Sequence, residues 1–314
     1  MIPTKLSHFD QATKTELLGK TDTESIIFTG IASNQWCIGD VPHVSYIASI
    51  VTDSVLQHFS DNYQKDLVAL NCFYFSKTIP GPLIVEIEEL KMSKKGYCVV
   101  RALLKQKKDL TPLRDIKAYK SAEWLVKLHC IFTIGNMDSE KGVTSFYRNP
   151  IAPSKEYIEP YHYAFMGEFL KTTIDATTFP RNDKQPGKPE IIQTVEFSDG
   201  RNIDFKSIPY LCDMFVTPPS LLGPSVLGGL VWCPTMQLEV QFKKRPTGKE
   251  VLAHFVAPHI INGRFDIDGE IWNENNEIVA TTRHQCLIVP WSRNSKNSDA
   301  VQRRQKMLND KSKL

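Results

Sequence analysis

Several common sequence signals are missing from this chain of 314 residues. The N-terminal stretch MIPTKLSHFDQATKTELL contains no apolar core of the length that a signal peptide needs. The longest weakly polar stretch, SLLGPSVLGGLVW, is broken by glycine and proline and is too short to span a bilayer. We therefore expect a chain made in the cytosol, without a membrane anchor.

Motifs of several enzyme classes are missing as well. The string GPSVLGG comes nearest to G-x-S-x-G but lacks the second glycine at the required place, which argues against a serine hydrolase of the α/β type. The sequence has no dinucleotide fingerprint, no P-loop and no H-E-x-x-H, and its seven scattered cysteines form no C-x-x-C pair. We expect no cofactor, no metal site and no disulfide framework.

The basic charge is concentrated at one end of the chain. Residues 292–314 carry seven Lys or Arg against two Asp or Glu, which leaves 31 basic and 33 acidic residues in the remaining chain. A nucleic-acid surface needs a basic face on the folded body, so we expect no nucleic-acid partner. The composition otherwise fits an ordinary globular protein, with 41% hydrophobic and 23% charged residues.

The final tripeptide, Ser312-Lys313-Leu314, reads as a receptor address for the peroxisome. The polar stretch SRNSKNSDAVQRRQKMLNDK before it can present the tripeptide to a receptor. This pattern predicts a location in the peroxisomal matrix and the import receptor as a partner. The alternative is a solvated terminus that ends this way by chance.

Two segments resemble each other at an offset of 167 residues. FYFSKTIPGPLIVEIEELKMSKKGYCVVRALLKQ begins at Phe73, and VQFKKRPTGKEVLAHFVAPHIINGRFDIDGEIWNE begins at Val240. Each reads as a strand, a Pro/Gly turn, a long strand, a Gly-containing hairpin and another long strand. A further strand follows each copy. Glycines stand at matching positions in the two copies: Gly81 matches Gly248, and Gly96 matches Gly263.

An apolar stripe at helical spacing precedes the first copy, in VPHVSYIASIVTDSVLQHF. The same offset places KSIPYLCDMF before the second copy, so that Tyr46 aligns with Asp213. We expect an N-terminal unit at 1–134, a surface connection at 135–200 with one short helical candidate at YAFMGEFLKTTI, a C-terminal unit at 201–291 and a basic tail at 292–314.

A helix followed by four or more antiparallel strands, repeated once, is typical of an α+β protein. The architecture in which a curved antiparallel sheet wraps one long helix is called a hotdog. The repeated pattern suggests a double hotdog, with a long helix in each of the two units, whereas periodicity alone supports only an α+β fold with repeated antiparallel sheets.

Polar residues near the repeat landmarks are the candidates for chemistry. Asp213 lies among apolar residues in YLCDMF, Thr235 begins a strand in PTMQLEV, and His284 lies in the terminal strand ATTRHQCLIV. A carboxylate beside a hydroxyl and an imidazole can fix and polarise one water molecule. The alternatives stay open: Asp213 could cap a helix, Thr235 could be an ordinary strand residue and His284 could lie on the surface.

A basic turn, FKKRPTG, is the candidate for substrate binding. Lys243, Lys244 and Arg245 could contact the phosphates of a nucleotide-bearing substrate, and Gly263 is grouped with them as a substrate-binding candidate. A solvated hairpin end is the alternative for the three basic residues.

Four strings, in order, resemble the thioesterase-like double-hotdog proteins related to bacterial acyl-CoA thioesterase II, and are most similar to the fungal branch. They are IGDVPHVSYIASI, RNIDFKSIPYLCDMF, WCPTMQLEVQFKKRP and NGRFDIDGEIWNENNEIVATTRHQCLIV, and the similarity runs from about Trp36 to Pro290. The resemblance implies that an Asp, a Thr or Ser, and a Gln orient the attacking water. These roles fall on Asp213, Thr235 and His284, the last with His in place of Gln.

A second departure lies at the start of the first helix, where the resemblance implies a Gly-Gly pair and this chain has Val44-Ser45. Glycine there lets a ligand approach the backbone amides. We therefore expect the working site in the second half.

The resemblance implies hydrolysis of a fatty acyl-CoA by an activated water, with the acyl chain in an apolar slot beside the helix. Two other functions stay open. A non-catalytic acyl-CoA-binding or assembly protein would fit the Val44-Ser45 departure. An enoyl-CoA hydratase or dehydratase has only DVPHV in its favour, an incomplete match to D-x-N-P-x-H. Hotdog faces commonly pair, so a homo-oligomer is also expected.

Overall fold

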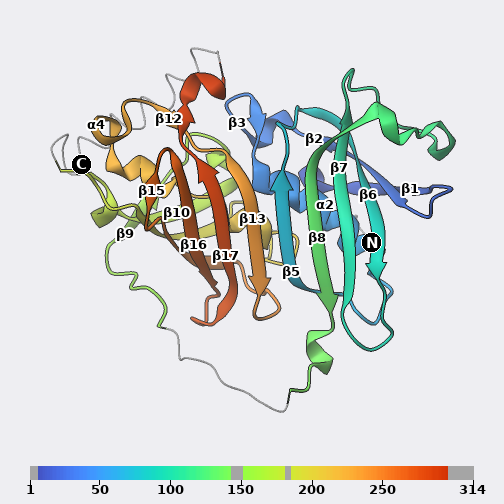
Figure 1. Ribbon diagram of the computed structural model, residues 1–314. Helices are drawn as coiled ribbons and strands as arrows, with labels where there is room; N and C mark the ends of the chain where they lie inside the picture. The colour runs from blue at the N-terminus through green and yellow to red at the C-terminus, as the bar shows by residue number, and fades with distance from the viewer. Residues whose placement is uncertain (1–5, 143–150, 181–184, 296–314) are drawn as a thin grey trace.

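The fold is seen in a computed structural model that describes residues 6–142, 151–180 and 185–295 (Figure 1). Most of its strands join in one continuous antiparallel sheet that runs through both halves of the chain. The α+β double hotdog expected from the sequence is confirmed.

The first half wraps its strands around one long helix, α2, which is Val44–His58. Nearly every α2 side chain from Ser45 to Val55 is buried, because strands cover one side and other segments cover the rest. The other elements of this half are α1 (His8–Thr13), β1 (Thr15–Lys20), β2 (Ile26–Ala32), β3 (Cys37–Ile38), β4 (Val41–Pro42), β5 (Asp66–Tyr74), β6 (Gly81–Lys91), β7 (Cys98–Lys107) and β8 (Trp124–Gly135).

The second half repeats the sheet but has only short helices. Its strands are β9 (Ile158–Tyr161), β10 (Leu170–Asp175), β11 (Glu190–Phe197), β12 (Val231–Trp232), β13 (Thr235–Phe242), β14 (Glu250–Val256), β15 (Ile260–Ile261), β16 (Arg264–Trp272), β17 (Ile278–Leu287) and β18 (Val289–Pro290). Its α-helices are α3 (Ile208–Leu211) and α4 (Pro224–Leu227).

The order of strands in the sheet shows the internal repeat. The first half runs β1-β2-β6-β7-β8-β5, and the second runs β13-β17-β16-β14-β11-β10-β9 in the opposite direction. The halves join where β5 pairs with β13, with Leu238 opposite Cys72, near the centre of Figure 1. At the offset seen in the sequence β5 matches β13, β6 matches β14 and β7 matches β16, so the structure contains the duplication that the glycines indicated.

The range 135–200 is not a mere surface connection, as the sequence pattern had suggested. It contributes β9, β10 and β11, and β11 pairs with β14 from Glu190 to Glu196. In the order of the sheet β11 and β10 are the counterparts of β2 and β1, which also precede the helix of their half, and β9 is an additional edge strand. The helical prediction for YAFMGEFLKTTI is wrong: Met166 adopts a left-handed conformation with φ of 60°, a 3-10 turn follows, and β10 begins at Leu170.

The prediction of a long helix in the second half is also wrong. Helix α3 ends after four residues, and the chain then passes through a turn that contains Asp213. Proline and glycine keep the following segment from resuming a long helix, since Pro218, Pro219 and Pro224 lack the amide proton that a helix interior needs, and Gly223 and Gly228 have positive φ.

In the described ranges 6–142, 151–180 and 185–295, no helix is both long enough and apolar enough to cross a membrane.

Candidate active site

Asp213 lies where the helices of the two halves meet. It follows α3, and α3 packs against α2. One polar contact links them: the Ser45 hydroxyl lies 3.4 Å from the carbonyl oxygen of Tyr210. The start of the long first-half helix and the end of the short second-half helix are therefore neighbours, and residues from both halves can face one site.

The Asp213 side chain is buried, with 7% of its surface exposed, and it lines a cavity of about 60 Å³. Polar lining comes from both halves: His43 belongs to the first, and Thr217, Thr235 and Asn294 belong to the second. The rest of the lining is mainly apolar and includes Ile38, Val41, Pro42, Val44, Phe215, Trp232, Pro234 and Ile267. A buried carboxylate that faces a small polar space is suited to binding one or two water molecules.

His284 contacts Asp213 from behind the cavity. Its Nδ1 lies 3.3 Å from Asp213 Oδ1, and the His284 side chain is fully buried. Its Nε2 lies 3.1 Å from Thr282 Oγ1, and that hydroxyl donates to the carbonyl oxygen of Glu239 at 2.6 Å. Because the Thr282 proton is already used, His284 Nε2 must donate to Thr282.

The donation from His284 Nε2 to Thr282 determines which atoms of His284 and Asp213 face each other. With a proton on Nε2, a neutral imidazole directs the lone pair of Nδ1 towards the Asp213 carboxylate. Two lone pairs at 3.3 Å repel each other, and Nδ1 has no aligned hydrogen bond to any other described residue. A proton between the two atoms turns this contact into a hydrogen bond, so His284 is a positioning partner of the Asp213 carboxylate.

His43 approaches Asp213 from the first half. Its Nδ1 lies 3.8 Å from Asp213 Oδ2 and 2.7 Å from the Ser45 hydroxyl. Burial lowers the pKa of the His43 imidazole and His284 lowers it further, while Asp213 raises it only in part. His43 is therefore neutral near neutral pH and can accept a proton.

The start of α2 adds backbone donors to the site. His43 is the N-cap residue of this helix, and its side chain makes no capping hydrogen bond. The first N–H groups of a helix have no acceptor within the helix, and its dipole makes that end positive. Val44 lines the cavity, so this end of α2 can stabilise negative charge that develops there.

Thr235 and Cys286 lie opposite each other on β13 and β17, and both line the cavity. The Cys286 thiol lies 3.7 Å from the Thr235 hydroxyl. Burial and the nearby Asp213 raise the pKa of this thiol well above its usual value. Cys286 therefore stays protonated and is a poor nucleophile, because thiolates rather than thiols attack carbonyl carbons.

The structure brings the predicted residues Asp213, Thr235 and His284 into one site, but not all three face the cavity. Asp213 and Thr235 line the cavity, whereas His284 lies behind Asp213. Sequence analysis missed His43 as a member of this site. The signal was a histidine directly before the apolar helix in VPHVSYIASI, which had been considered only as part of an incomplete hydratase motif.

The basic turn does not lie at the cavity. Lys243, Lys244 and Arg245 follow the end of β13, about 25 Å along the strand from Thr235 at its start. Lys244 pairs with Glu277 at 2.5 Å, and the Arg245 guanidinium contacts Asp66 and Asp138 at 2.8 and 3.0 Å. The turn therefore lies far from the cavity, and Lys244 and Arg245 are paired with acidic side chains.

Gly263 and the C-terminal tripeptide are the remaining predicted residues. Gly263 precedes β16 at the same end of the sheet as Thr235, since Phe265 pairs with Cys286 and Cys286 with Thr235. Gly263 has φ of 71°, which favours glycine, and its carbonyl accepts from the Ile288 amide. Ser312, Lys313 and Leu314 lie outside the described residues.

A basic residue that the sequence had not indicated stands beside the cavity. The Lys77 ammonium lies 4.9 Å from the centre of the Trp232 ring, and Trp232 lines the cavity. Lys77 also donates to the carbonyl oxygen of Arg293. Lys77 is the counterpart of Lys244 at the offset of the repeat, so the duplication placed equivalent lysines in different surroundings.

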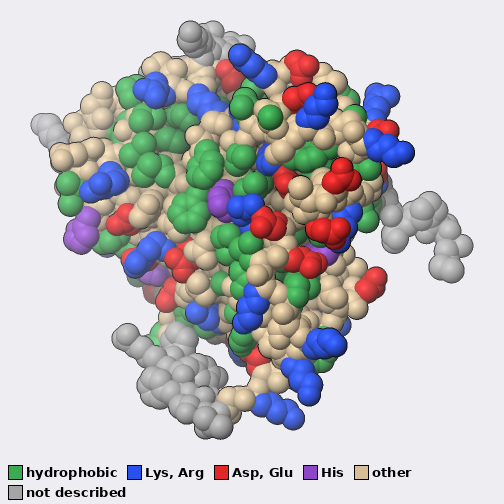
Figure 2. All heavy atoms as spheres, turned by 45° about the vertical axis from the view of Figure 1, so that its right-hand side comes forward, with side chains coloured by type: hydrophobic (Ala, Val, Ile, Leu, Met, Phe, Trp, Pro, Cys, Tyr) green, Lys and Arg blue, Asp and Glu red, His purple; other side chains and the backbone are tan. Residues whose placement is uncertain are grey.

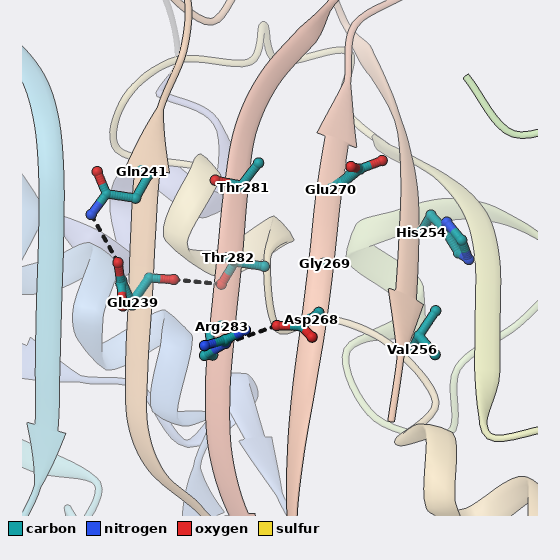
Figure 3. A pocket seen from close by; sticks show the side chains of 10 residues that line it. All are labelled: Glu239, Gln241, His254, Val256, Asp268, Gly269, Glu270, Thr281, Thr282 and Arg283. Atoms are coloured by element: carbon teal, nitrogen blue, oxygen red, sulfur yellow. Dashed lines mark hydrogen bonds and ion pairs between the residues drawn. The ribbon is translucent and has the colours of Figure 1, made fainter. Parts of the chain in front are cut away.

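A larger depression, of about 510 Å³, lies on the outer face of the second-half sheet (Figure 3). Two of its charged side chains pair with each other, Arg283 and Asp268 at 2.8 Å, and His254 pairs with Glu190, outside the lining, at 2.7 Å. Arg283 and His284 are adjacent on β17 and therefore point to opposite faces of the sheet. The depression is separate from the cavity of Asp213.

Comparison with known protein families gives two matches. The acyl-CoA thioesterase N-terminal domain matches residues 32–118, and the acyl-CoA thioesterase C-terminal domain matches residues 150–288. The second match begins before β9, which agrees with the three strands that this range contributes. No curated protein matches the sequence.

Solved structures share the fold at low sequence identity. A thioesterase II from Thermobifida fusca has a TM-score of 0.72 at 16% identity, over 92% of this chain and 99% of that chain. A conserved hot dog protein from Alicyclobacillus acidocaldarius has a TM-score of 0.70 at 15% identity, over 91% and 99%. The acyl-CoA thioesterase II from Mycobacterium marinum has a TM-score of 0.64 at 12% identity, over 90% and 98%.

The two family matches together cover well over half of the chain, in the order N-terminal domain and then C-terminal domain. The order agrees with the duplicated sheet, and the solved structures share that double-hotdog fold along nearly their whole length. The chain therefore belongs to the acyl-CoA thioesterase family, as a tandem of its N-terminal and C-terminal domains.

Proposed function

We propose that this protein hydrolyses acyl-CoA thioesters with a water molecule that Asp213 activates. The observation that carries the proposal is the buried Asp213 carboxylate, which faces a small cavity between His43 of one half and His284 of the other. Thr235 lines the same cavity and supplies a hydroxyl that can orient the water. Membership of the acyl-CoA thioesterase family supports the choice of substrate.

In the first step, water attacks the thioester carbonyl carbon and gives one proton to the Asp213 carboxylate. A bond forms between the water oxygen and this carbon, and the carbonyl oxygen becomes an oxyanion. The backbone N–H groups at the start of α2 stabilise that charge without having to reorganise. His284 keeps Asp213 in place through its contact at 3.3 Å.

In the second step, the tetrahedral intermediate breaks its carbon–sulfur bond. The electron pair leaves with the CoA sulfur, which takes up a proton, and the acyl group leaves as a carboxylic acid. Neutral His43 is close enough to Asp213 to relay the proton between the carboxyl group and the sulfur. No covalent acyl-enzyme is required, in keeping with the protonated Cys286 thiol.

The direct test measures free thiol released from acyl-CoA by the purified protein and by the variant Asp213→Asn. We expect release with the unchanged protein and almost none with the variant, because an amide cannot accept the proton. Equal rates in the two proteins would remove Asp213 from the mechanism. Binding of acyl-CoA without turnover in both would favour the non-catalytic alternative.

A second candidate function is hydration of an enoyl thioester, which the position of His43 opposite Asp213 supports. Water addition to a double bond needs one group to accept a proton from water and another to donate a proton to carbon. His43 and Asp213 could divide these roles across the cavity. Loss of enoyl absorbance without release of thiol would identify this reaction.

Contact with the CoA phosphates is assigned to Lys77 in place of the basic turn. Lys77 lies beside the cavity against Trp232, whereas Lys244 and Arg245 are paired with acidic side chains far along β13. A lysine is a suitable point charge for a phosphate group.

Peroxisomal location and self-association remain proposals. Deletion of Ser312 to Leu314 should abolish import of a fluorescent fusion, and unchanged import would contradict the address.

Exposed apolar side chains on the surface in Figure 2 give self-association a physical basis. Phe73 and Phe75, with 44% and 62% of their surfaces exposed, belong to this class. Sedimentation of the full chain would measure its oligomeric state.

A further inference from the structure

We propose that the acyl group of the substrate is short, with about two to four carbons, in place of the fatty chain that the sequence had led us to expect. This inference rests on the proposed function and concerns the space available at Asp213. It follows from the size of the cavity, from the side chains that form its walls, and from the contacts that hold these walls.

The cavity size limits the acyl group directly. An apolar cavity of about 150 Å³ accommodates benzene, which corresponds to about 25 Å³ for each carbon atom. On that scale, the cavity of about 60 Å³ that Asp213 lines holds about two carbons. Counted beyond the carbonyl carbon, an acetyl group has one carbon and a propionyl group two, which fit, and a butyryl group has three, which need about 75 Å³ and are near the limit.

Large side chains from the second half occupy the space that a longer chain would need. Phe215 lines the cavity and is held between two rings, with its centre 4.4 Å from that of Phe255 and 5.7 Å from that of His284. Ile267 is fully buried on β16, between β14 and β17. Neither side chain can move aside without displacing packed neighbours.

The segment after β18 closes the cavity from another side and is tied to the first half. Asn294 lines the cavity and donates through Nδ2 to the carbonyl oxygen of Ile38 at 3.0 Å. Ser295 donates to Asp40 at 2.7 Å. A Cβ atom at Gly39, whose φ is 61°, would lie only 2.2 Å from Asn294 Oδ1, which shows how closely the two segments approach.

The start of α2 leaves no further room. Val44 lines the cavity, and Ser45 is fully buried with its hydroxyl 2.7 Å from His43 Nδ1. Extending the cavity along the helix would therefore require displacement of Val44 and loss of the contact between Ser45 and His43. The walls on all these sides are packed or hydrogen-bonded.

The test measures kcat/KM for straight-chain acyl-CoA thioesters from acetyl to palmitoyl, by release of thiol. In an open apolar slot, each added methylene would tighten binding about fourfold. We expect the opposite trend here, with the highest kcat/KM between two and four carbons and at least a tenfold fall by eight. A maximum at ten carbons or more would overturn the inference and leave the proposed hydrolysis intact.

Binding of non-hydrolysable thioethers keeps the inference testable if no substrate is turned over. Affinities for S-ethyl-CoA, S-butyl-CoA and S-octyl-CoA are measured by calorimetry with the unchanged protein. Affinity that falls by tenfold or more from ethyl to octyl supports a short acyl group, and affinity that rises overturns it. Failure to release thiol from any acyl-CoA counts against hydrolysis alone.

Enlarging the cavity should shift the preference. In Phe215→Ala, we expect the optimum to move to longer chains, by four or more carbons. Phe179→Ala is the matched control, because Phe179 is another partly buried phenylalanine that packs against the same core without lining the cavity. Trp232→Ala opens the cavity independently, should Phe215→Ala fail to fold. An unchanged optimum in a folded cavity variant would overturn the assigned walls.

Discussion

The two halves of the molecule share one arrangement of strands and differ in their helices. The first has a 15-residue helix, α2, whereas α3 in the second has four residues. At the offset of the repeat, Tyr46 occupies the position of Asp213. Tyr46 is a structural residue, since its hydroxyl accepts from the Ser33 amide and donates to the carbonyl oxygen of Ala12.

This difference shows how a duplicated fold can form one composite site. The first half contributes the start of a long helix and the neutral imidazole of His43. The second half contributes a carboxylate in a turn, together with His284 and Thr235 from its strands. Neither half alone contains both the proton acceptor and the helix start that we assign to the reaction.

The largest expected effect is on kcat, and it distinguishes Asp213 from its counterpart Tyr46. Asp213→Asn should lower kcat by at least about 1000-fold and leave thermal stability nearly unchanged, because the amide has the same size. Tyr46→Phe should retain kcat but lose about 1 to 3 kcal/mol of unfolding free energy, because buried backbone groups lose their partner. Thiol release and urea unfolding test both variants, and a large loss of kcat in Tyr46→Phe would contradict the division of roles.

Removal of the imidazole contributed by the first half should have the next largest effect. His43→Gln retains polarity and approximate size but cannot relay a proton, so we expect kcat to fall about 100-fold. KM should change little, since the loss concerns proton transfer. Steady-state kinetics with an acyl-CoA of two to four carbons tests this variant, and an unchanged kcat would exclude His43 from the reaction.

His284 should matter less than His43, because it positions Asp213 and does not line the cavity. In His284→Gln an amide N–H can still donate to Asp213, so we expect a loss of kcat of about tenfold. His284→Leu should lose far more, and equal losses in the two variants would argue for packing alone.

The repeat provides a matched pair of lysines for the nucleotide end of the substrate. Lys77→Ala should raise KM for acyl-CoA about three- to tenfold and leave KM for an acyl-pantetheine without a nucleotide unchanged. Lys244→Ala should leave both KM values unchanged, because Lys244 is paired with Glu277 at the far end of β13. If Lys244→Ala raised KM more than Lys77→Ala, the basic turn would regain its predicted role.

The smallest effect concerns stability and pH. Burial lowers the pKa of His43 in the folded protein below its ordinary value of about 6.5. Between these two pKa values the unfolded chain binds more protons, so stability falls as the pH falls below about 6.5, by at most about 1.4 kcal/mol per pH unit for this group. His43→Gln should remove that part of the slope in urea unfolding between pH 5 and 7.5, and an identical slope would contradict the buried neutral imidazole.

The duplicated pattern of glycines and strands was sufficient to predict the sheet, because period-two burial and turn residues are local properties. It failed for residues 135–200 because β9 and β10 are short, and irregular segments separate them from each other and from β11. It also failed for the second helix, although Pro218, Pro219 and Pro224 were visible in the sequence. A helix there had been inferred from the offset to the first helix, whereas proline removes the backbone donors that a longer helix needs.

For the candidate site, the resemblance indicated Asp213, Thr235 and His284, and the structure brings the three together. It could not indicate that His284 lies behind the Asp213 carboxylate, because the distance of a side chain from a cavity depends on tertiary packing. Nor could the sequence relate His43 to Asp213, which are 170 residues apart and meet only because α2 and α3 are in contact.

By itself, the sequence determined the duplicated antiparallel sheet, since side-chain alternation and turn chemistry act over a few neighbouring residues. Tertiary structure alone decided that one composite site forms between the halves, that the basic turn lies far from it, and how little space faces Asp213. These are consequences of which surfaces pack together, and packing joins residues that no local pattern connects.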